Sequence, residues 1–134
     1  MTLVESLRTC LLERFATSKG RASRSEYWWF QLALLVVTTA WPSPFGGFGD
    51  LASGELPEVS MPGLILSLVA LLALLVPATS VTVRRLHDID RAGTWMLLGL
   101  VPLVGMIVLL VFTCRRGTSG PNRFGPDPLA PAPT

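Results

Sequence analysis

The sequence predicts an all-α membrane protein in which an N-terminal amphipathic helix precedes a bundle of three transmembrane helices. The first observation is composition, since half of the 134 residues are apolar and 15% are charged, against about 25% in an average soluble domain. The second is distribution, because residues 27–49, 59–83 and 92–114 contain no charged side chain. A soluble chain of this length has too much surface for such runs, and a disordered chain is far less apolar. Two cysteines are too few for a secreted disulfide scaffold.

The amphipathic helix is predicted over residues 2–17. Thr2 and Glu5 have the spacing of a capping box, in which the hydroxyl and the carboxylate each accept from the other residue's backbone N–H. Apolar side chains then share one helical face at Val4, Leu7, Leu11 and Phe15. Gly20 is a natural end for this helix. Such a helix either lies in the membrane interface or packs on the other helices, and the pattern favours neither.

The first membrane helix is predicted over residues 24–41. Ser23 and Glu26 form a second capping box, and Pro42 marks the end of the helix. At 1.5 Å per residue the helix reaches about 27 Å, just enough for a hydrocarbon core of about 30 Å. Aromatic rings stand at both ends, as expected at the headgroup level: Tyr27, Trp28, Trp29 and Trp41.

The second membrane helix is predicted over residues 63–83. Small or weakly polar side chains form a stripe on one face, at Ser67, Ala70, Ala73, Pro77 and Ser80. Helices in lipid approach each other through small residues, so this face is expected to contact another helix. If the helix continues past Val83, the same side carries Arg84, His87 and Arg91. The polar segment would then lie under the bundle.

The third membrane segment, residues 94–114, is open to two interpretations. Its length matches the bilayer and favours a third full span. Helix-breaking residues near its middle leave open a kinked helix, or two half-helices that enter the membrane and return: Gly99, Pro102 and Gly105. Re-entrant backbone must be shielded by protein. Residues 1–128 are thus predicted to form one membrane domain, and residues 129–134 a disordered tail.

The distribution of basic residues predicts the orientation. Lys and Arg number five in residues 1–26, none in 42–58, three in 84–91 and three in 115–134. Because cytoplasmic segments carry the excess of Lys and Arg, the N-terminus and the 84–91 segment are predicted to be cytoplasmic and the 42–58 loop external. A third full span would place the last three arginines outside, whereas a re-entrant segment would keep them inside. A net charge of +2 is too small to indicate a nucleic-acid partner.

Three polar motifs flank the apolar runs: GRASRSEYWWF from Gly20, RRLHDIDRAG from Arg84 and GTSGPNRFGPDP from Gly117. In this order, with apolar runs between them, they resemble domain-of-unknown-function family 805 over residues 15–128. The resemblance implies a multi-pass protein of the bacterial inner membrane and supplies no activity. The chain departs from the family pattern at Ala92 and Thr94, where the family usually has Ser and Trp, which weakens any role for a hydroxyl or an interfacial ring there.

The arginines of the first two motifs predict an anion site at the cytoplasmic headgroup level, formed by Arg21, Arg24, Arg84, Arg85 and Arg91. Guanidinium groups match the geometry of phosphate, and basic pockets at this level bind anionic lipids. Arg115, Arg116 and Arg123 join this site only if the tail is cytoplasmic. The simpler alternative is that the arginines set the topology and pair with Asp88 and Asp90.

Two further chemistries involve His87, the single histidine. With Asp88 and Asp90 it offers imidazole and carboxylate ligands, but the surrounding arginines oppose a cation, so neither a metal nor a cofactor is predicted. Acid–base catalysis by His87 oriented by Asp88 is a weak candidate, because no nucleophile motif accompanies the pair. The remaining polar residues of the motifs are predicted to be structural, with Arg123 pairing with an acid: Glu26, Asp88, Asp90, Asn122, Arg123 and Asp127.

The sequence therefore predicts a non-catalytic inner-membrane module whose Arg-rich cytoplasmic face binds anionic lipid headgroups or a partner protein. One alternative is a membrane-surface enzyme that uses His87 and Asp88. The other is a subunit of an oligomeric transporter, which would require a homo-oligomer or a membrane protein partner, because three helices cannot enclose a pathway. The absence of charged side chains from the apolar runs counts against transport. No Walker-type phosphate loop is present in the sequence.

Overall fold

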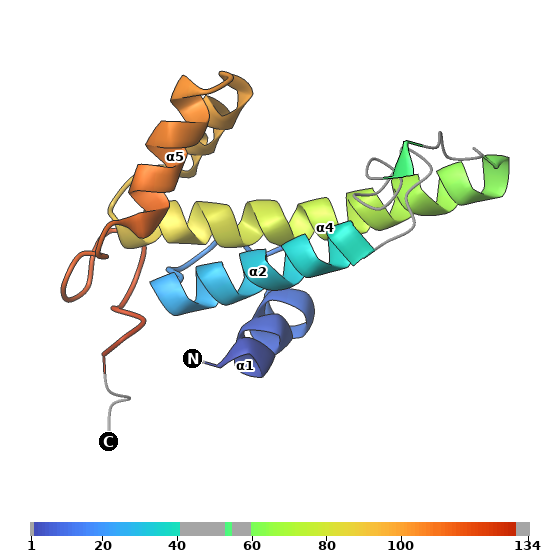
Figure 1. Cartoon of the computed structure of the whole chain (residues 1–134). Coiled ribbons are helices and arrows are strands. Elements are labelled where there is room, and N and C mark those ends of the chain that lie inside the picture. Colours follow the sequence, from blue (N-terminus) through green and yellow to red (C-terminus); the bar gives the residue numbers. More distant parts are fainter. Residues whose placement is uncertain (1, 41–52, 55–59, 131–134) are drawn as a thin grey trace.

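The structure is a computed structural model, and it describes residues 2–40, 53–54 and 60–130. Within these residues the regular elements are all helical. They are α1 (Leu3–Arg8), a π-helical turn η1 (Thr9–Glu13), α2 (Arg24–Ala40), α4 (Met61–Asp88), a 3₁₀ helix η2 (Gly93–Leu100) and α5 (Val104–Cys114). α2 runs beside α4, α1 packs across α2, and α5 projects from the C-terminal end of α4 (Figure 1). The all-α class is confirmed.

The N-terminal helix is shorter than predicted. The capping box of Thr2 and Glu5 is confirmed, but α1 and η1 together end at Glu13, so the prediction of a helix over 2–17 is wrong at its C-terminal end. The face that packs on the rest of the protein contains the small residues Ser6 and Cys10, which are buried. Small side chains here let α1 approach α2 closely. Of the predicted apolar face, Leu7 packs against the core, whereas Val4, Leu11 and Phe15 are exposed.

α2 begins at Arg24, as predicted, and Ser23 is its N-cap, since the Ser23 hydroxyl accepts from the Glu26 backbone N–H at 3.2 Å. The reciprocal half of the predicted capping box does not form, because the Glu26 carboxylate pairs with an arginine of α4 instead. Trp28 and Trp29 are exposed at this end of the helix. The predicted aromatic residue at the other end, position 41, lies outside the described residues.

α4 starts at Met61, capped by Ser60, and continues to Asp88, five residues past the predicted end. The second polar motif therefore begins inside the helix. Pro77 and Ser80 of the predicted small-residue face are buried, whereas Ala73 is exposed, so close packing is confined to the C-terminal half of the helix. Among the described helices, α4 is the one long and apolar enough to cross a membrane by length and composition.

The third apolar run is not a single helix but two shorter ones, as the interpretation with an interruption near its middle allowed. η2 ends at Leu100, a turn follows in which Leu103 has a φ of +59°, and α5 returns alongside η2. The two helices meet closely at Gly105, where a Cβ would overlap the carbonyl group of Leu98. Trp95 and Phe112 pack edge to face at the base, with ring centroids 5.7 Å apart. The run is thus an apolar hairpin, and a bundle of three transmembrane helices is not confirmed.

Candidate functional site

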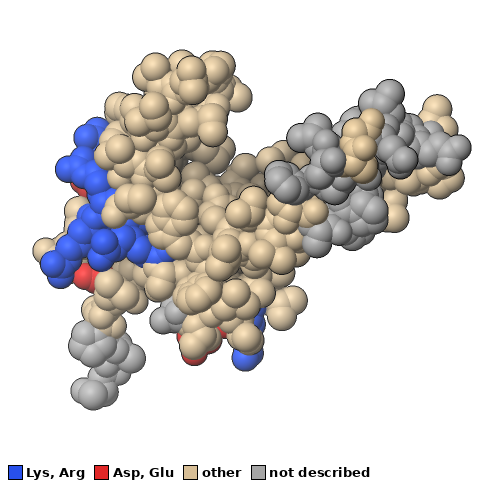
Figure 2. Space-filling model, viewed as in Figure 1, with Lys and Arg blue, Asp and Glu red and all other residues tan. Residues whose placement is uncertain are grey.

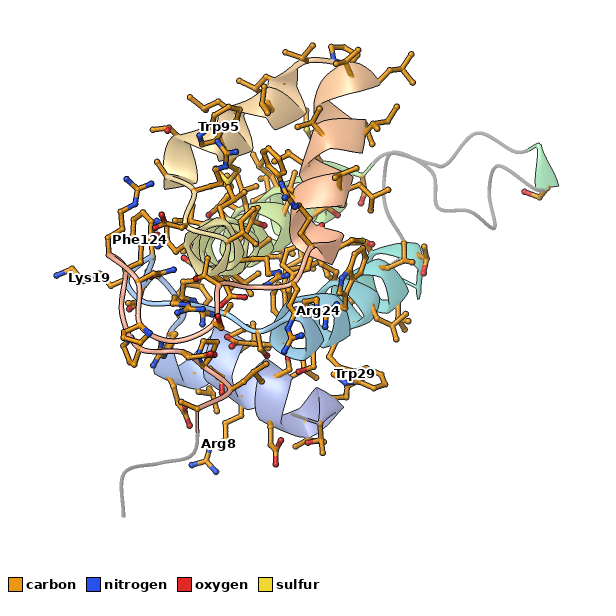
Figure 3. The ribbon with its side chains drawn as sticks, turned by 90° about the vertical axis from the view of Figure 1, so that its left-hand side faces the viewer. Arg8, Lys19, Arg24, Trp29, Trp95 and Phe124 are labelled. Atoms are coloured by element: carbon orange, nitrogen blue, oxygen red, sulfur yellow. The ribbon has the colours of Figure 1, made fainter. Side chains whose placement is uncertain are left out.

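The three polar motifs meet at one end of the molecule, where α2 begins, α4 ends and the chain leaves α5. We call this region the polar junction; it comprises residues 20–26, 84–91 and 113–127. Basic side chains gather at this end, whereas most of the remaining visible surface is uncharged (Figure 2). Figure 3 looks onto the junction, with Arg24 below the lower end of α5 and Phe124 at its edge.

Arg21 ties the first motif to the other two. Its Nε donates to Asp88 Oδ1 at 2.9 Å, its Nη1 to the Gly120 carbonyl at 2.6 Å and its Nη2 to the Thr118 carbonyl at 2.5 Å. The residue is 5% exposed. Because a guanidinium group presents five donors in a fixed plane, one side chain can fix a helix end and a loop together.

Arg85, on α4, likewise connects the three motifs. It pairs with Asp88 and donates to the carbonyl oxygens of Thr113 and Arg115, which end α5, and to that of Ala22 at 3.4 Å. Asp88 therefore lies between two buried guanidinium groups. No room remains for a side chain at position 117, because a Cβ on Gly117 would collide with the Asp88 carboxylate.

A second buried ion pair, Arg84 with Glu26, joins α4 to α2. The thiol of Cys10 lies against both partners, 3.8 Å from Glu26 Oε1 and 3.6 Å from Arg84 Nη2, and the Ser6 hydroxyl donates to the Glu26 carbonyl. Burial raises the pKa of the Cys10 thiol above its ordinary value, Glu26 adds to this effect and Arg84 opposes it. This pair holds α1, α2 and α4 together.

The third motif caps the C-terminal end of α4, whose last carbonyl groups lack partners within the helix. Asn122 Nδ2 donates to the His87 carbonyl at 2.9 Å, and the Thr118 N–H donates to the Asp88 carbonyl at 2.8 Å. The Asp127 carboxylate accepts from the backbone N–H groups of Leu129 and Gly120, which lower its pKa, that of Leu129 most strongly. The motif is thus a folded cap on α4.

The predicted pairing of Arg123 with an acid is present in the structure. Arg123 Nε lies 3.0 Å from Asp90 Oδ1, and the two side chains are 60% and 47% exposed. This is an ion pair in contact with solvent, unlike those of Arg84 and Arg85. The side chains predicted to be structural thus each have a partner: Glu26, Asp88, Asp90, Asn122, Arg123 and Asp127.

His87 and Asp88 are not arranged as a catalytic pair. The His87 ring stacks on Phe124, with centroids 3.8 Å apart, and its Nδ1 lies 3.2 Å from the Gly20 carbonyl oxygen. Asp88 faces the two arginines instead and so does not orient the imidazole. Throughout the described part of the chain, no group of three or more His, Cys, Asp or Glu side chains is placed to hold a metal ion.

The arginines predicted to bind an anion divide into two sets. Arg21, Arg84 and Arg85 are buried and contact carboxylates. Arg24 and Arg91 are exposed. Exposed arginines also follow α5, at positions 115 and 116. None of these four exposed arginines forms an ion pair with a described residue, although Arg91 lies over the rings of Trp95 and Phe112. The exposed set carries the unpaired positive charge at the surface of the junction.

Sequence analysis missed two features of the junction. The first is the binding of distant backbone carbonyl groups by buried arginines. Arg21 binds that of Gly120, about 100 positions along the chain, and Arg85 that of Thr113, about 30 positions along; no local pattern signals such contacts. Neither Ser6 nor Cys10 was singled out, although their spacing of four places both small side chains on one helical face, which was a usable signal for close packing.

These features define a class of small all-helical protein whose apolar body is closed at one end by buried pairs of arginine and carboxylate side chains. Comparison with known families identifies it: the chain belongs to the family described as protein of unknown function DUF805, whose model matches residues 15–126. It is similar to the inner membrane protein YhaI of Escherichia coli K12, with 42% identity over 118 residues, which are 88% of this chain and 91% of the relative. It is also similar to the inner membrane protein YhaH of the same strain, with 39% identity over 119 residues, which are 88% of this chain and 92% of the relative. No solved structure matches the chain.

Proposed function

We propose that this chain is a non-catalytic inner-membrane module whose polar junction lies at the cytoplasmic surface and binds anionic lipid headgroups. The observation that carries this proposal is the set of exposed arginines at the junction, Arg24, Arg91, Arg115 and Arg116, which have no carboxylate partner among the described residues. Basic groups next to a membrane attract anionic lipids by about 1 kcal/mol each.

The exposed apolar side chains support a membrane location. Along α4, Ile65, Leu68 and Leu72 each have more than half of their surface exposed, and Met106 and Ile107 do so on α5. Water is a poor solvent for such continuous apolar surface, whereas lipid tails match it. Residues 61–83 of α4 extend about 35 Å, enough for a hydrocarbon core of about 30 Å.

The contacts within the junction support one topology. Segments that touch at the membrane surface lie on the same side, so the chain between them crosses the bilayer an even number of times. Between the first and second motifs, α2 and α4 supply two crossings. Between the second and third motifs, the apolar hairpin supplies none and is re-entrant. All eleven basic residues then lie in segments on one side, which the positive-inside rule makes cytoplasmic.

A pair of C-terminal reporter fusions tests this topology. Green fluorescent protein fused after the last residue should fluoresce, and alkaline phosphatase at the same position should be inactive, because the tail is cytoplasmic. A fusion within residues 42–58 should give the opposite result and serves as the control. Alkaline phosphatase activity at the C-terminus would show that the hairpin spans the membrane and would overturn the topology.

Lipid binding is tested by replacing the four exposed arginines with Gln together and measuring the phosphatidylglycerol that remains bound after purification in mild detergent. We expect bound phosphatidylglycerol to fall at least tenfold relative to the parent protein, with phosphatidylethanolamine little changed. Arg8→Gln is the control, since Arg8 pairs with Glu13 on the exposed side of α1. Equal phosphatidylglycerol content in the parent and the fourfold variant would overturn the proposal and favour a protein partner.

A further inference from the structure

We propose that a cavity between the start of α2 and the segment after α5 is a binding site for a single phosphate group, with Arg24 and Arg116 as its ligands. The inference rests on the proposed function and deepens it, because it replaces a diffuse basic surface with one site. The cavity has a volume of about 340 Å³, within the range of small-ligand pockets. Its lining comprises Arg24, Asp88, Arg116, Gly117, Thr118, Ser119, Asp127 and Leu129.

The charges around the cavity favour an anion. Of its two carboxylates, that of Asp88 is shared by two buried guanidinium groups, and that of Asp127 accepts from two backbone N–H groups. Neither Arg24 nor Arg116 forms an ion pair with any residue that the structure describes. The Asp127 carboxylate keeps its negative charge, and Arg116 contributes to lowering its pKa, but Arg24 and Arg116 together with Arg21 and Arg85 outnumber the two carboxylates, so the net charge around the cavity is positive. Two arginines in the lining of one cavity suit phosphate, whose oxygens accept paired N–H donors.

Neutral donors complete the lining. The Ser119 hydroxyl has no hydrogen bond within the described residues, so it is available to a ligand. Arg24 is the first residue of α2, a helix of 17 residues, and the N-terminal end of such a helix carries partial positive charge. The Ser119 hydroxyl and the helix N-terminus add to the attraction of the two guanidinium groups for an anion, and neither feature would form a site by itself.

The walls of the cavity are fixed before a ligand binds. Arg21 holds the carbonyl groups of Thr118 and Gly120, and Arg85 holds that of Arg115, so the backbone on both sides of Arg116 is anchored to buried side chains. Preorganised walls reduce the entropy lost on binding. The buried arginines thus fix the walls of the cavity, and the exposed arginines supply the groups that contact the ligand.

The test compares two double variants in nanodiscs or mild detergent. Arg24→Gln/Arg116→Gln removes both proposed ligands, whereas Arg8→Gln/Lys19→Gln removes the same charge from exposed positions outside both the cavity lining and the set of four arginines proposed to bind lipid. Native mass spectrometry with added phosphatidylglycerol should show one saturable adduct for the parent and the control, weakened about tenfold or more in the first variant. Asp127→Asn should strengthen binding, because it removes a negative charge from the lining.

Inorganic phosphate in a parallel titration identifies the source of the phosphate group. Phosphatidylglycerol that binds in preference to both phosphatidylcholine and inorganic phosphate supports a lipid headgroup. Competition by millimolar inorganic phosphate, lost in the Arg24/Arg116 variant, supports the same site with a soluble ligand. Equal weakening in both double variants overturns the single site and leaves the diffuse basic surface. No weakening in either, together with an unaffected fourfold variant, overturns the proposed function as well.

Discussion

Asp88→Asn tests whether the polar junction is held together by buried charge. The Asp88 carboxylate is 4% exposed and contacts two guanidinium groups that are themselves buried, those of Arg21 and Arg85. The substitution keeps the size and one acceptor oxygen of the side chain and removes its charge. Two buried cations are then left without a compensating anion.

The expected loss of stability is large. Removing one partner of a buried ion pair costs about 3–5 kcal/mol, because the other charge stays desolvated. This corresponds to a change on the order of 10²–10³-fold in the folding equilibrium. Asp90→Asn is a matched control two positions away, since the side chains of Asp90 and its partner Arg123 are 47% and 60% exposed. An exposed pair contributes about 0–1 kcal/mol.

The assay uses the buried thiol of Cys10 as the reporter of opening, in a Cys114→Ser background that removes the exposed thiol. Under native conditions in detergent, the rate of maleimide labelling should rise on the order of 10²-fold or more for Asp88→Asn, because labelling follows the open population. For Asp90→Asn it should change less than about fivefold. Equal labelling rates in the two variants would show that the charge of Asp88 does not stabilise the junction.

Two further predictions concern the hairpin and the buried thiol. Gly105→Ala should separate η2 from α5, because its Cβ would overlap the Leu98 carbonyl. It should lower the melting temperature clearly more than Gly99→Ala, whose Cβ would meet only a leucine methyl group at 3.2 Å. Equal melting temperatures for the two variants would contradict the close approach. The raised pKa of Cys10 means that the folded state favours the protonated thiol. Its contribution to stability is complete below the ordinary pKa of 9.0 and is lost as the pH rises above it, so alkaline titration should destabilise the parent relative to Cys10→Ser, and parallel pH profiles would refute the shift.

The helical class and most helix starts could be predicted from the sequence because their causes are local. The capping residues Thr2 and Ser23 lie within three positions of the groups they bind. The sequence left open whether α4 continues past Val83 to Arg85, because the helical spacing of side chains continued there but the run of apolar residues ended. The end of the N-terminal helix at Glu13 has no local stop residue, so the sequence placed it too late.

The sequence predicted which residues make up the candidate site but not how they are arranged in space. The sequence showed which arginines and carboxylates exist, and that Arg123 would pair with an acid. It could not show that Arg84 and Arg85 are buried while Arg24 is exposed, because burial depends on contacts made by Glu26 and by carbonyl groups far along the chain. Of the arginines predicted to form one anion site, the buried ones hold the junction together, and only the exposed ones belong to the surface that we propose binds a ligand.

The third apolar run turns back on itself because of contacts at its two ends, made by residues outside the run. A helix of 21 apolar residues would satisfy its own backbone and match the bilayer, so composition alone favours a span. In the structure, Arg85 binds the carbonyl groups of Thr113 and Arg115 where the run ends, and Arg91 lies over Trp95 where it begins. Both arginines belong to the second motif, which holds the two ends of the run at one place. A full span would take the carbonyl groups of Thr113 and Arg115 away from Arg85 and leave it with Asp88 and Ala22 as partners, and the loss of these two buried hydrogen bonds opposes the crossing.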